Sequence, residues 1–311
     1  MFVQALLLPW AAYRTMVVLF LPTGPMRHLK RWNTRHRVAK ILMSLSLGAC
    51  VVYGGQDPAS SDATTESSWS LVWSDEFNKE GLPDTTRWDY DVGGSGWGNN
   101  ELQYYTARRS ENARIKDGVL IIEAHQEAWL DSTGFTSARL VTRGRADWQY
   151  GRFEICARLP EGRGTWPAIW MLPRDWDLGN GGWPDNGEID IMEHVGYDPS
   201  VVHATVHTKT HNHVDGTQIG RQIVVPKAQS EFHTYVLEWE AEQLTAYVDD
   251  TPYFTHTSGD GDWRVWPYDR PFHLILNIAV GGNWGGVKGV DTSVFPQRLE
   301  IDFVRVYQKM H

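Results

Sequence analysis

The stretch WPDNGEIDIMEHVG, residues 183–196, places three carboxylates among the apolar residues of a buried strand. Alternate residues of a β-strand point to the same face, so Glu188 and Asp190 lie on one side of this strand. Glu193 joins them only if one extra residue interrupts the alternation. We therefore predict a β-bulge with Met192 as the extra residue, which turns all three acids to one face.

Two of these carboxylates have the spacing that glycosidic bond cleavage needs. Four strand steps would separate Glu188 from Glu193 by about 13 Å between Cα atoms, and side chains leaning together bring the carboxyl groups to about 5 Å, as in retaining glycosidases. Neighbouring anions repel, so we expect at least one proton to be held near neutral pH. One carboxylate then attacks while its protonated partner protonates the leaving oxygen. A solvated acidic face or a cation site with oxygen ligands is the alternative.

Short alternating or β-branched runs recur from Trp69 onward, separated by Gly, Asn, Asp and Pro clusters. No long segment there has helical periodicity. Regular short strands with turn signals predict one all-β domain, a sandwich or barrel, over residues 69–311. The runs that carry this prediction are GVLIIEAH, GRFEICARL, HATVHT, TYVLEWE, LTAYVDD, HLILNIAV and IDFVRVY.

The charge of the chain is unevenly distributed. Residues 1–49 hold seven Lys and Arg and no acid, which leaves 22 basic against 38 acidic residues and a charge of about −16 for the remainder. An acidic body argues against nucleic acid as a partner and favours a neutral substrate. The 16 Trp residues suggest flat apolar surfaces presented to a ligand in addition to core filling.

The first 68 residues have the composition of an export signal and a tether. Residues 1–25 are apolar but interrupted, and we interpret them as an upstream extension of a chain that starts at Met26. Residues 26–50 form a basic segment and a short apolar segment that ends in LGAC, which resembles a bacterial lipobox with Cys50 as the lipidated residue. An ordinary cleaved leader is the alternative. Residues 51–68 are small and polar, and predict a flexible linker.

The stretch GEIDIMEHVG resembles the catalytic signature of glycoside hydrolase family 16, in the version with the extra residue. The resemblance extends over about residues 69–308, and its motifs are similar to those of bacterial laminarinases. It implies a β-jelly-roll sandwich of two antiparallel sheets, with a concave cleft for the substrate. It rests also on WSDEFN, GGSGWGNNELQYYT, ARLVTRGRADWQYGRFEICARLPEGRGTWPAIWMLP, HATVHT and LNIAVGGNWGG.

The resemblance implies endo-acting hydrolysis of a laminarin-like β-1,3-glucan by double displacement, without a catalytic cofactor. Glu188 matches the nucleophile, Glu193 the general acid and base, and Asp190 the residue that assists the nucleophile. Mixed-linkage β-glucanase or galactan hydrolase activity is the alternative within the family. A non-catalytic glucan-binding protein is the alternative from another class, although all three acids are present. We expect a monomer.

A glycan cleft needs aromatic planes for the C–H faces of sugar rings and polar groups for the hydroxyls. Core packing is the competing explanation for each Trp. We expect His207 on the side of the acid/base, and we expect the other histidines of HATVH and HNH to be solvated rather than metal ligands. The predicted sugar-binding residues are Trp166, Trp170, Trp183, Trp284, Asn99, Glu101, Arg139, His207 and Gln218.

The family commonly holds one structural calcium ion away from the catalytic residues. By resemblance, Glu76, the backbone of Gly118, and Asp302 match its ligands, and such oxygens suit a hard cation. A surface salt bridge would use the same acids. Of the two cysteines, Cys156 is then alone, and we expect a small buried strand residue.

Overall fold

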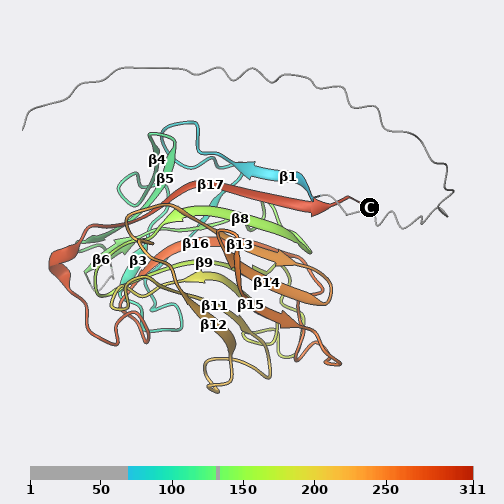
Figure 1. Ribbon diagram of the computed structural model, residues 1–311. Helices are drawn as coiled ribbons and strands as arrows, with labels where there is room; N and C mark the ends of the chain where they lie inside the picture. The colour runs from blue at the N-terminus through green and yellow to red at the C-terminus, as the bar shows by residue number, and fades with distance from the viewer. Residues whose placement is uncertain (1–68, 131–133, 311) are drawn as a thin grey trace, which may run out of the picture. The chain divides into compact units, whose positions relative to one another are not determined.

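The computed structural model describes residues 69–130 and 134–310, in which two β-sheets enclose an apolar core (Figure 1). The described part of the chain holds seventeen strands and a single 3₁₀ turn, η1 (Thr292–Val294). The prediction of an all-β fold is therefore confirmed. Within these ranges no helix is long and apolar enough to cross a membrane. The predicted extension, leader, Cys50 and linker lie outside the described residues.

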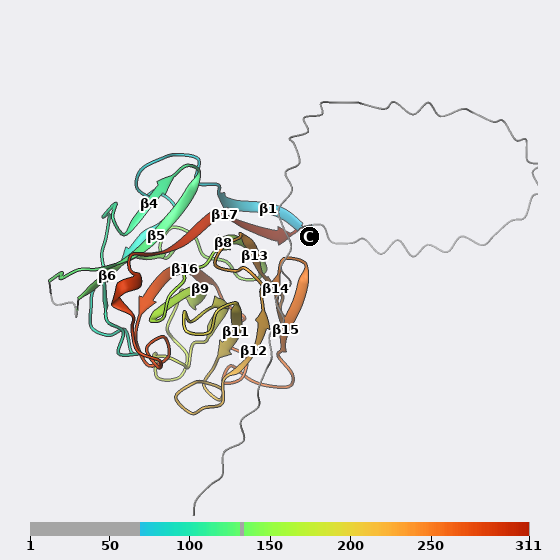
Figure 2. The same ribbon diagram turned by 60° about the vertical axis from the view of Figure 1, so that its left-hand side comes forward.

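The larger sheet has ten strands in the order β15-β14-β13-β8-β17-β5-β6-β3, with β1 paired to β17 and β4 to β5. β1 runs along β17 in both views (Figures 1 and 2). One pair, β3 with β6, is parallel, so this sheet is not purely antiparallel as predicted. The strands are β1 (Trp69–Asp75), β3 (Gln103–Tyr105), β4 (Ala113–Lys116), β5 (Val119–Gln126), β6 (Phe135–Ser137), β8 (Gly151–Arg158), β13 (His233–Trp239), β14 (Gln243–Val248), β15 (Thr251–Thr257) and β17 (Gln297–Lys309).

The second sheet has seven strands in the order β12-β11-β10-β9-β16-β7-β2, all in antiparallel pairs. It carries the three acids on β10, which pairs with β9 on one side and with β11 on the other. The strands are β2 (Asp89–Asp91), β7 (Arg139–Val141), β9 (Thr165–Pro173), β10 (Glu188–Glu193), β11 (Val201–His207), β12 (Ile219–Val224) and β16 (Phe272–Val280).

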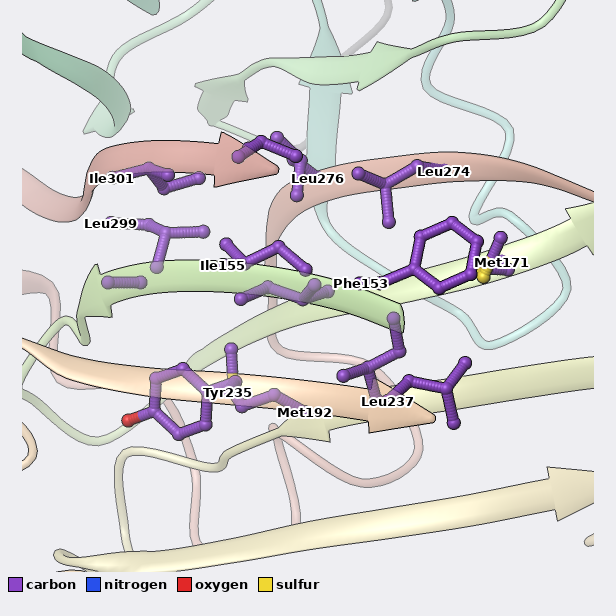
Figure 3. Packing of buried hydrophobic residues seen from close by; sticks show 14 of the residues in the cluster. Phe153, Ile155, Met171, Met192, Tyr235, Leu237, Leu274, Leu276, Leu299 and Ile301 are labelled. Atoms are coloured by element: carbon purple, nitrogen blue, oxygen red, sulfur yellow. The ribbon is translucent and has the colours of Figure 1, made fainter. Parts of the chain in front are cut away.

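The core lies between the two sheets and follows the alternation of side chains. On β16, every second residue from Phe272 to Val280 belongs to the buried cluster, and on β8 the same holds for Phe153 and Ile155 (Figure 3). Burial of such side chains contributes about 1.5–3 kcal/mol each. The remaining residues of β16, which include Asn277, therefore point to the opposite face of the second sheet.

The predicted β-bulge is present on β10. Asp190 pairs with Trp170 of β9 and Met192 with the next residue, Ile169, so Ile191 has no partner on β9. In the ladder with β9 the extra residue is thus Ile191 rather than Met192 as predicted, whereas in the ladder with β11 neither of these two residues has a partner. Both side chains are buried, at 1% and 0% exposure. Two consecutive residues enter the core, and the next residue returns to the face of Asp190.

Candidate active site

A cleft lies on the face of the second sheet that points away from the core. Its lining contains all three acids and six of the nine predicted sugar-binding residues, which confirms that these segments meet. The lining residues are Trp97, Gly98, Asn99, Glu101, Tyr105, Arg139, Trp166, Ala168, Trp170, Leu172, Trp176, Trp183, Glu188, Asp190, Glu193, His213, Val214, Asn277 and Ala279.

The three acids of β10 are held with their protons near neutral pH. Burial raises the pKa of Glu188, of Asp190 and of Glu193 to about 8 each, and for the two glutamates the charge of Asp190 adds to the effect. A buried carboxyl binds its proton more tightly because the charged form loses its hydration. At neutral pH the cluster therefore holds protons that can be transferred.

Two tryptophans donate to the two glutamates. Nε1 of Trp183, in the loop before β10, lies 3.0 Å from Oε2 of Glu188. Nε1 of Trp166, on β9, lies 2.9 Å from Oε1 of Glu193. Each donation lowers the pKa of its carboxyl against the larger effect of burial. The two carboxyls are thus oriented by indoles that come from different segments.

His207 lies on the other side of the acid cluster from the one predicted. It pairs with Glu188 across β10 and β11, and its Nε2 lies 3.2 Å from Asp190 Oδ2 and 3.7 Å from Glu188 Oε1. The residue opposite Glu193 is His203. The regular register of β10 and β11 before the bulge places His207 opposite Glu188. At 5% exposure His207 is buried.

Asn277 joins two parts of the cleft floor. Its Oδ1 accepts from Trp170 Nε1 at 2.7 Å, and its Nδ2 donates to the Tyr105 hydroxyl at 3.0 Å. Tyr105 in turn donates to Glu101 at 3.4 Å. Neither Asn277 nor Tyr105 was among the predicted residues. The available signal was the single amide in the apolar run LILNIAV, on the face that does not enter the core.

The guanidinium of Arg139 packs against two aromatic rings of the cleft. Its guanidinium carbon lies 4.9 Å from the centroid of Trp97 and 4.6 Å from that of Trp170, and its Nε lies 3.1 Å from Asp91. Cation–π contacts of this kind fix the ring planes. Arg139 therefore both lines the cleft and holds two of its indoles. Burial also raises the pKa of the neighbouring Glu101.

The model for glycosyl hydrolases family 16 matches residues 100–305. The chain belongs to glycosyl hydrolase family 16. It is 56% identical over 292 residues to a beta-glucanase of Rhodothermus marinus, covering 92% of this chain and 98% of that protein. The crystal structure of the laminarinase from Rhodothermus marinus superposes with a TM-score of 0.77 at 60% identity, over 78% of this chain and 99% of that chain. The crystal structure of SCLam, a non-specific endo-beta-1,3(4)-glucanase, superposes with a TM-score of 0.73 at 46% identity. The match covers 78% of this chain and 92% of that chain.

Three predicted sugar-binding residues, Trp284, Gln218 and His207, do not line the cleft of this family 16 chain. Trp284 packs edge-on against Trp166, with ring centroids 5.5 Å apart, and against His203 at 4.9 Å. It therefore supports the indole that donates to the acid/base candidate. Gln218 is exposed in the loop before β12.

Two loops of this family 16 chain contribute cleft residues that the sequence did not reveal. Trp176 comes from the loop after β9, and His213 and Val214 come from the loop after β11. The rings of His213 and Trp183 lie 4.7 Å apart, so the two loops meet beside the acids. His213 was expected to be a solvated loop histidine, and it is an exposed loop residue that also lines the cleft. Its place in the cleft depends on a contact between loops that no local pattern encodes.

Family 16 chemistry requires no catalytic cofactor. Within the described ranges, three potential metal ligands converge only at Glu188, Asp190 and His207, whose donor atoms lie within 4.8 Å of one another. The predicted calcium ligands are not grouped in this way. Both oxygens of Glu76 accept from Arg305, at 2.9 and 2.7 Å. Asp302 is exposed on β17. The Glu76 carboxylate thus fits the ion pair better than a calcium site.

Proposed function

We propose that this chain is an endo-acting β-1,3-glucanase that hydrolyses laminarin-like glucans with retention of anomeric configuration. The observation that carries the proposal is the pair of glutamates on the bulged strand β10. Each receives an indole N–H, and both face one aromatic cleft. The close similarity to a beta-glucanase and to a laminarinase supports β-1,3-glucan as the substrate.

Glu188 acts as the nucleophile. Its carboxylate attacks the anomeric carbon and forms a glycosyl ester, while the bond to the leaving oxygen breaks. Two neighbours favour the charged form of this group, because both the Trp183 donor and the charge of His207 lower its pKa. Asp190, whose Oδ2 lies 3.2 Å from His207 Nε2, positions that imidazole beside the nucleophile.

Glu193 acts as general acid and then as general base. It gives its proton to the leaving oxygen, and in the second step its carboxylate takes a proton from the water that hydrolyses the ester. Glu101 raises the pKa of Glu193 through its negative charge and does not act in this way on Glu188. The charge of Glu101 therefore favours the protonated form of Glu193 that the first step requires, and the charge of Glu193 in turn raises the pKa of Glu188.

The test is to incubate the protein with laminarin and to follow reducing ends and product sizes. We expect internal cleavage, with Glu188→Ser and Glu193→Gln each losing at least about 10³-fold in kcat while still binding glucan. No release from any β-1,3-glucan, with binding retained, would instead identify a non-catalytic binding protein. A variant of either glutamate near the wild-type rate would contradict the assigned roles.

Mixed-linkage β-1,3-1,4-glucan is the second candidate substrate. The observation in its favour is the similarity to SCLam, whose described activity is non-specific between these linkages. A panel of laminarin, curdlan, lichenan, agarose and carrageenan, with product sizing, separates this candidate from galactan hydrolysis. Comparable kcat/KM on laminarin and lichenan would favour the mixed-linkage activity.

We also propose that the chain is exported and held at the bacterial cell envelope by a lipid on Cys50. The support is the basic and apolar segment of residues 26–50 and its LGAC ending. Incorporation of labelled fatty acid into the wild type but not into Cys50→Ser would support the anchor. A soluble secreted product in both would indicate an ordinary leader. Sedimentation of the enzyme is expected to give a monomer.

A structural calcium ion at Glu76, Gly118 and Asp302 is a separate proposal that rests on family resemblance. The Arg305 ion pair would have to rearrange to release Glu76 for such an ion. Thermal unfolding with Ca²⁺ and with chelator is the test. A melting temperature that does not change between the two would reject the ion.

A further inference from the structure

The proposed nucleophile belongs to a group of three side chains of the kinds that bind metal ions. Glu188 and Asp190 lie on β10, and His207 lies on β11 directly opposite Glu188. One donor atom from each side chain lies within 4.8 Å of the other two, and the described part of the chain holds no second group of this kind. We call these three residues the nucleophile cluster. One imidazole with two carboxylates suits Zn²⁺ and similar transition metals, whereas Mg²⁺ and Ca²⁺ prefer oxygen ligands alone.

The distances within the nucleophile cluster are close to those of a tetrahedral zinc site. His207 Nε2 lies 3.2 Å from Asp190 Oδ2 and 3.7 Å from Glu188 Oε1. A tetrahedral Zn²⁺ ion, with nitrogen and oxygen ligands at about 2.0–2.2 Å, sets its ligand atoms about 3.3–3.6 Å apart. Small rotations of the side chains therefore bring the three atoms to bonding distance from one ion. Glu188 and Asp190 also line the cleft, which gives the ion a path of entry and room for a water molecule as fourth ligand.

One donor atom of the nucleophile cluster is buried without a hydrogen bond. Asp190 is 4% exposed and His207 is 5% exposed. No described residue forms a hydrogen bond with Oδ2 of Asp190, although His207 Nε2 lies 3.2 Å from it. A buried carboxylate oxygen without a donor costs free energy, because it has lost its contacts with water. A cation bound between this oxygen and the imidazole would satisfy it.

The nucleophile cluster is held in place before any ligand binds. Tyr268, which is fully buried, has its hydroxyl 3.3 Å from Glu188 O and 3.0 Å from His207 O, so it ties the backbones of the two strands together. Trp183 Nε1 donates to Oε2 of Glu188, which leaves Oε1 as the oxygen nearer to His207. Ligands that are already ordered lose little conformational entropy when an ion binds. The cluster is therefore preorganised for a single ion.

We propose that the nucleophile cluster binds one Zn²⁺ ion, or a similar transition-metal dication, and that this ion reversibly inhibits the enzyme. An ion bound to Oε1 occupies a lone pair of the nucleophile. It also adds positive charge beside the anomeric carbon, where the transition state is itself positively charged. Both effects oppose attack by Glu188. The inhibition rests on the proposed function, whereas the binding of the ion does not.

The direct test is calorimetric titration of the metal-free full-length chain, without an affinity tag, with Zn²⁺. Because the ligands bind a metal only when deprotonated, the titration is made above neutral pH. We expect the wild type to bind an ion that His207→Ala and Asp190→Asn each bind at least about 100-fold more weakly, since loss of an outer-shell partner alone costs about 10- to 100-fold. No binding, or the same Kd in the wild type and in both variants, would overturn the proposal.

His203→Ala is the matched control. His203 lies on the same strand as His207, is paired with Glu193, and does not belong to the nucleophile cluster. Its Zn²⁺ affinity should equal that of the wild type, and a loss as large as that of His207→Ala would contradict the assigned ligands. Co²⁺ gives a second measurement that needs no variant. The strong visible absorption of tetrahedral Co²⁺ should appear in the wild type and disappear when Zn²⁺ is added, and its absence would contradict the tetrahedral site.

Rates of laminarin hydrolysis with increasing Zn²⁺ test the inhibition. The inhibition constant should match the calorimetric Kd, a chelator should restore the rate, and equal concentrations of Mg²⁺ or Ca²⁺ should leave it unchanged. Full activity at Zn²⁺ concentrations that saturate the calorimetric site would show that the ion does not contact the nucleophile, and would overturn the proposal. If the metal-free protein releases no reducing ends, the glucanase assignment fails, and the calorimetric comparison of the variants still decides the metal site.

Discussion

The indole N–H of Trp183 lies 3.0 Å from Oε2 of Glu188, so the loop before β10 orients the carboxyl of the proposed nucleophile and stabilises its charged form. The donor favours the charged carboxylate and lowers its pKa, whereas burial raises it. The corresponding contact between Trp166 and Glu193 is made from β9. These two donors can be removed separately, and this gives distinct tests of the two roles.

Trp183→Phe removes the donor to Glu188 and keeps an aromatic ring. The pKa of Glu188 should rise, so less of the nucleophile is charged at low pH and the acidic limb of the pH profile of kcat/KM moves to higher pH. We also expect kcat to fall about 10- to 100-fold, since a hydrogen bond to a charged group is lost. Trp170→Phe is the control, because its indole donates to Asn277. A shift of the alkaline limb instead would indicate that Glu188 is the general acid and not the nucleophile.

Trp166→Phe removes the donor to Glu193. The pKa of Glu193 should rise, so the acid stays protonated to higher pH and the alkaline limb moves upward while the acidic limb stays in place. Steady-state rates across the pH range, fitted for both limbs, measure this. An unchanged alkaline limb would mean that Glu193 is not the general acid.

Glu188→Gln should stabilise the fold in a pH-dependent way. The pKa of Glu188 is raised from 4.5 to about 8 in the folded protein. The contribution of the Glu188 carboxyl to the free energy of unfolding is thus complete below about pH 4.5 and is lost as the pH rises through 8. A Gln side chain is neutral at every pH and loses nothing. The difference in melting temperature should grow from pH 5 to pH 8, by about 2–4 °C for each kcal/mol. Glu242→Gln is the control, because Glu242 is exposed, and its difference in melting temperature from the wild type should not grow with pH.

Met192→Ala tests whether core packing behind the bulge maintains the acid/base. Both Met192 and Met171 have 0% exposure, and Figure 3 shows both in the core. Met192→Ala and the control Met171→Ala should each lower the free energy of unfolding by about 2–5 kcal/mol. We expect kcat to fall several-fold more for Met192→Ala, because Met192 precedes Glu193 directly. Denaturant unfolding and kcat at a temperature where both variants are folded provide the comparison. Equal kcat values would show that the bulge does not depend on this side chain.

Lys209→Met should loosen the two loops that meet beside the nucleophile. Lys209 Nζ lies 2.8 Å from Asp185 Oδ1, and Asp185 is only 1% exposed. Without its partner, the buried carboxylate favours movement of the loop that carries Trp183. We expect kcat to fall about 3- to 10-fold with a shifted acidic limb, and Lys209→Arg to restore part of it. Loss of stability without any change in the pH profile would limit the ion pair to a structural role.

Local patterns were sufficient for much of the site. The period of two and the interrupted alternation at Glu188–Glu193 depend only on neighbours in sequence, so the strand, its bulge and the common face of the acids were predictable. The stacking candidates Trp166 and Trp170 followed from the same alternation on β9. Gln218 did not fit, because an exposed loop residue has no periodicity that fixes its direction.

The other residues of the site are positioned by contacts between segments that are far apart in the sequence. Asn277 meets Tyr105 across 172 residues of sequence, and His213 reaches the cleft only because two loops pack together. The side on which His207 lies depends on the pairing of β11 with β10, which places it opposite Glu188. Such meetings are decided by tertiary packing, which single-sequence patterns do not contain.

The unpaired Ile191 also bears on how this sheet can evolve. An in-frame loss of that one codon would restore plain alternation from Glu188 to Glu193 and leave every acid directed at the sugar. What would change is the angle at which the two glutamates approach a glycosidic oxygen. A lineage can therefore retune its reaction geometry through a single indel, without ever passing through an ancestor whose acids are turned inward.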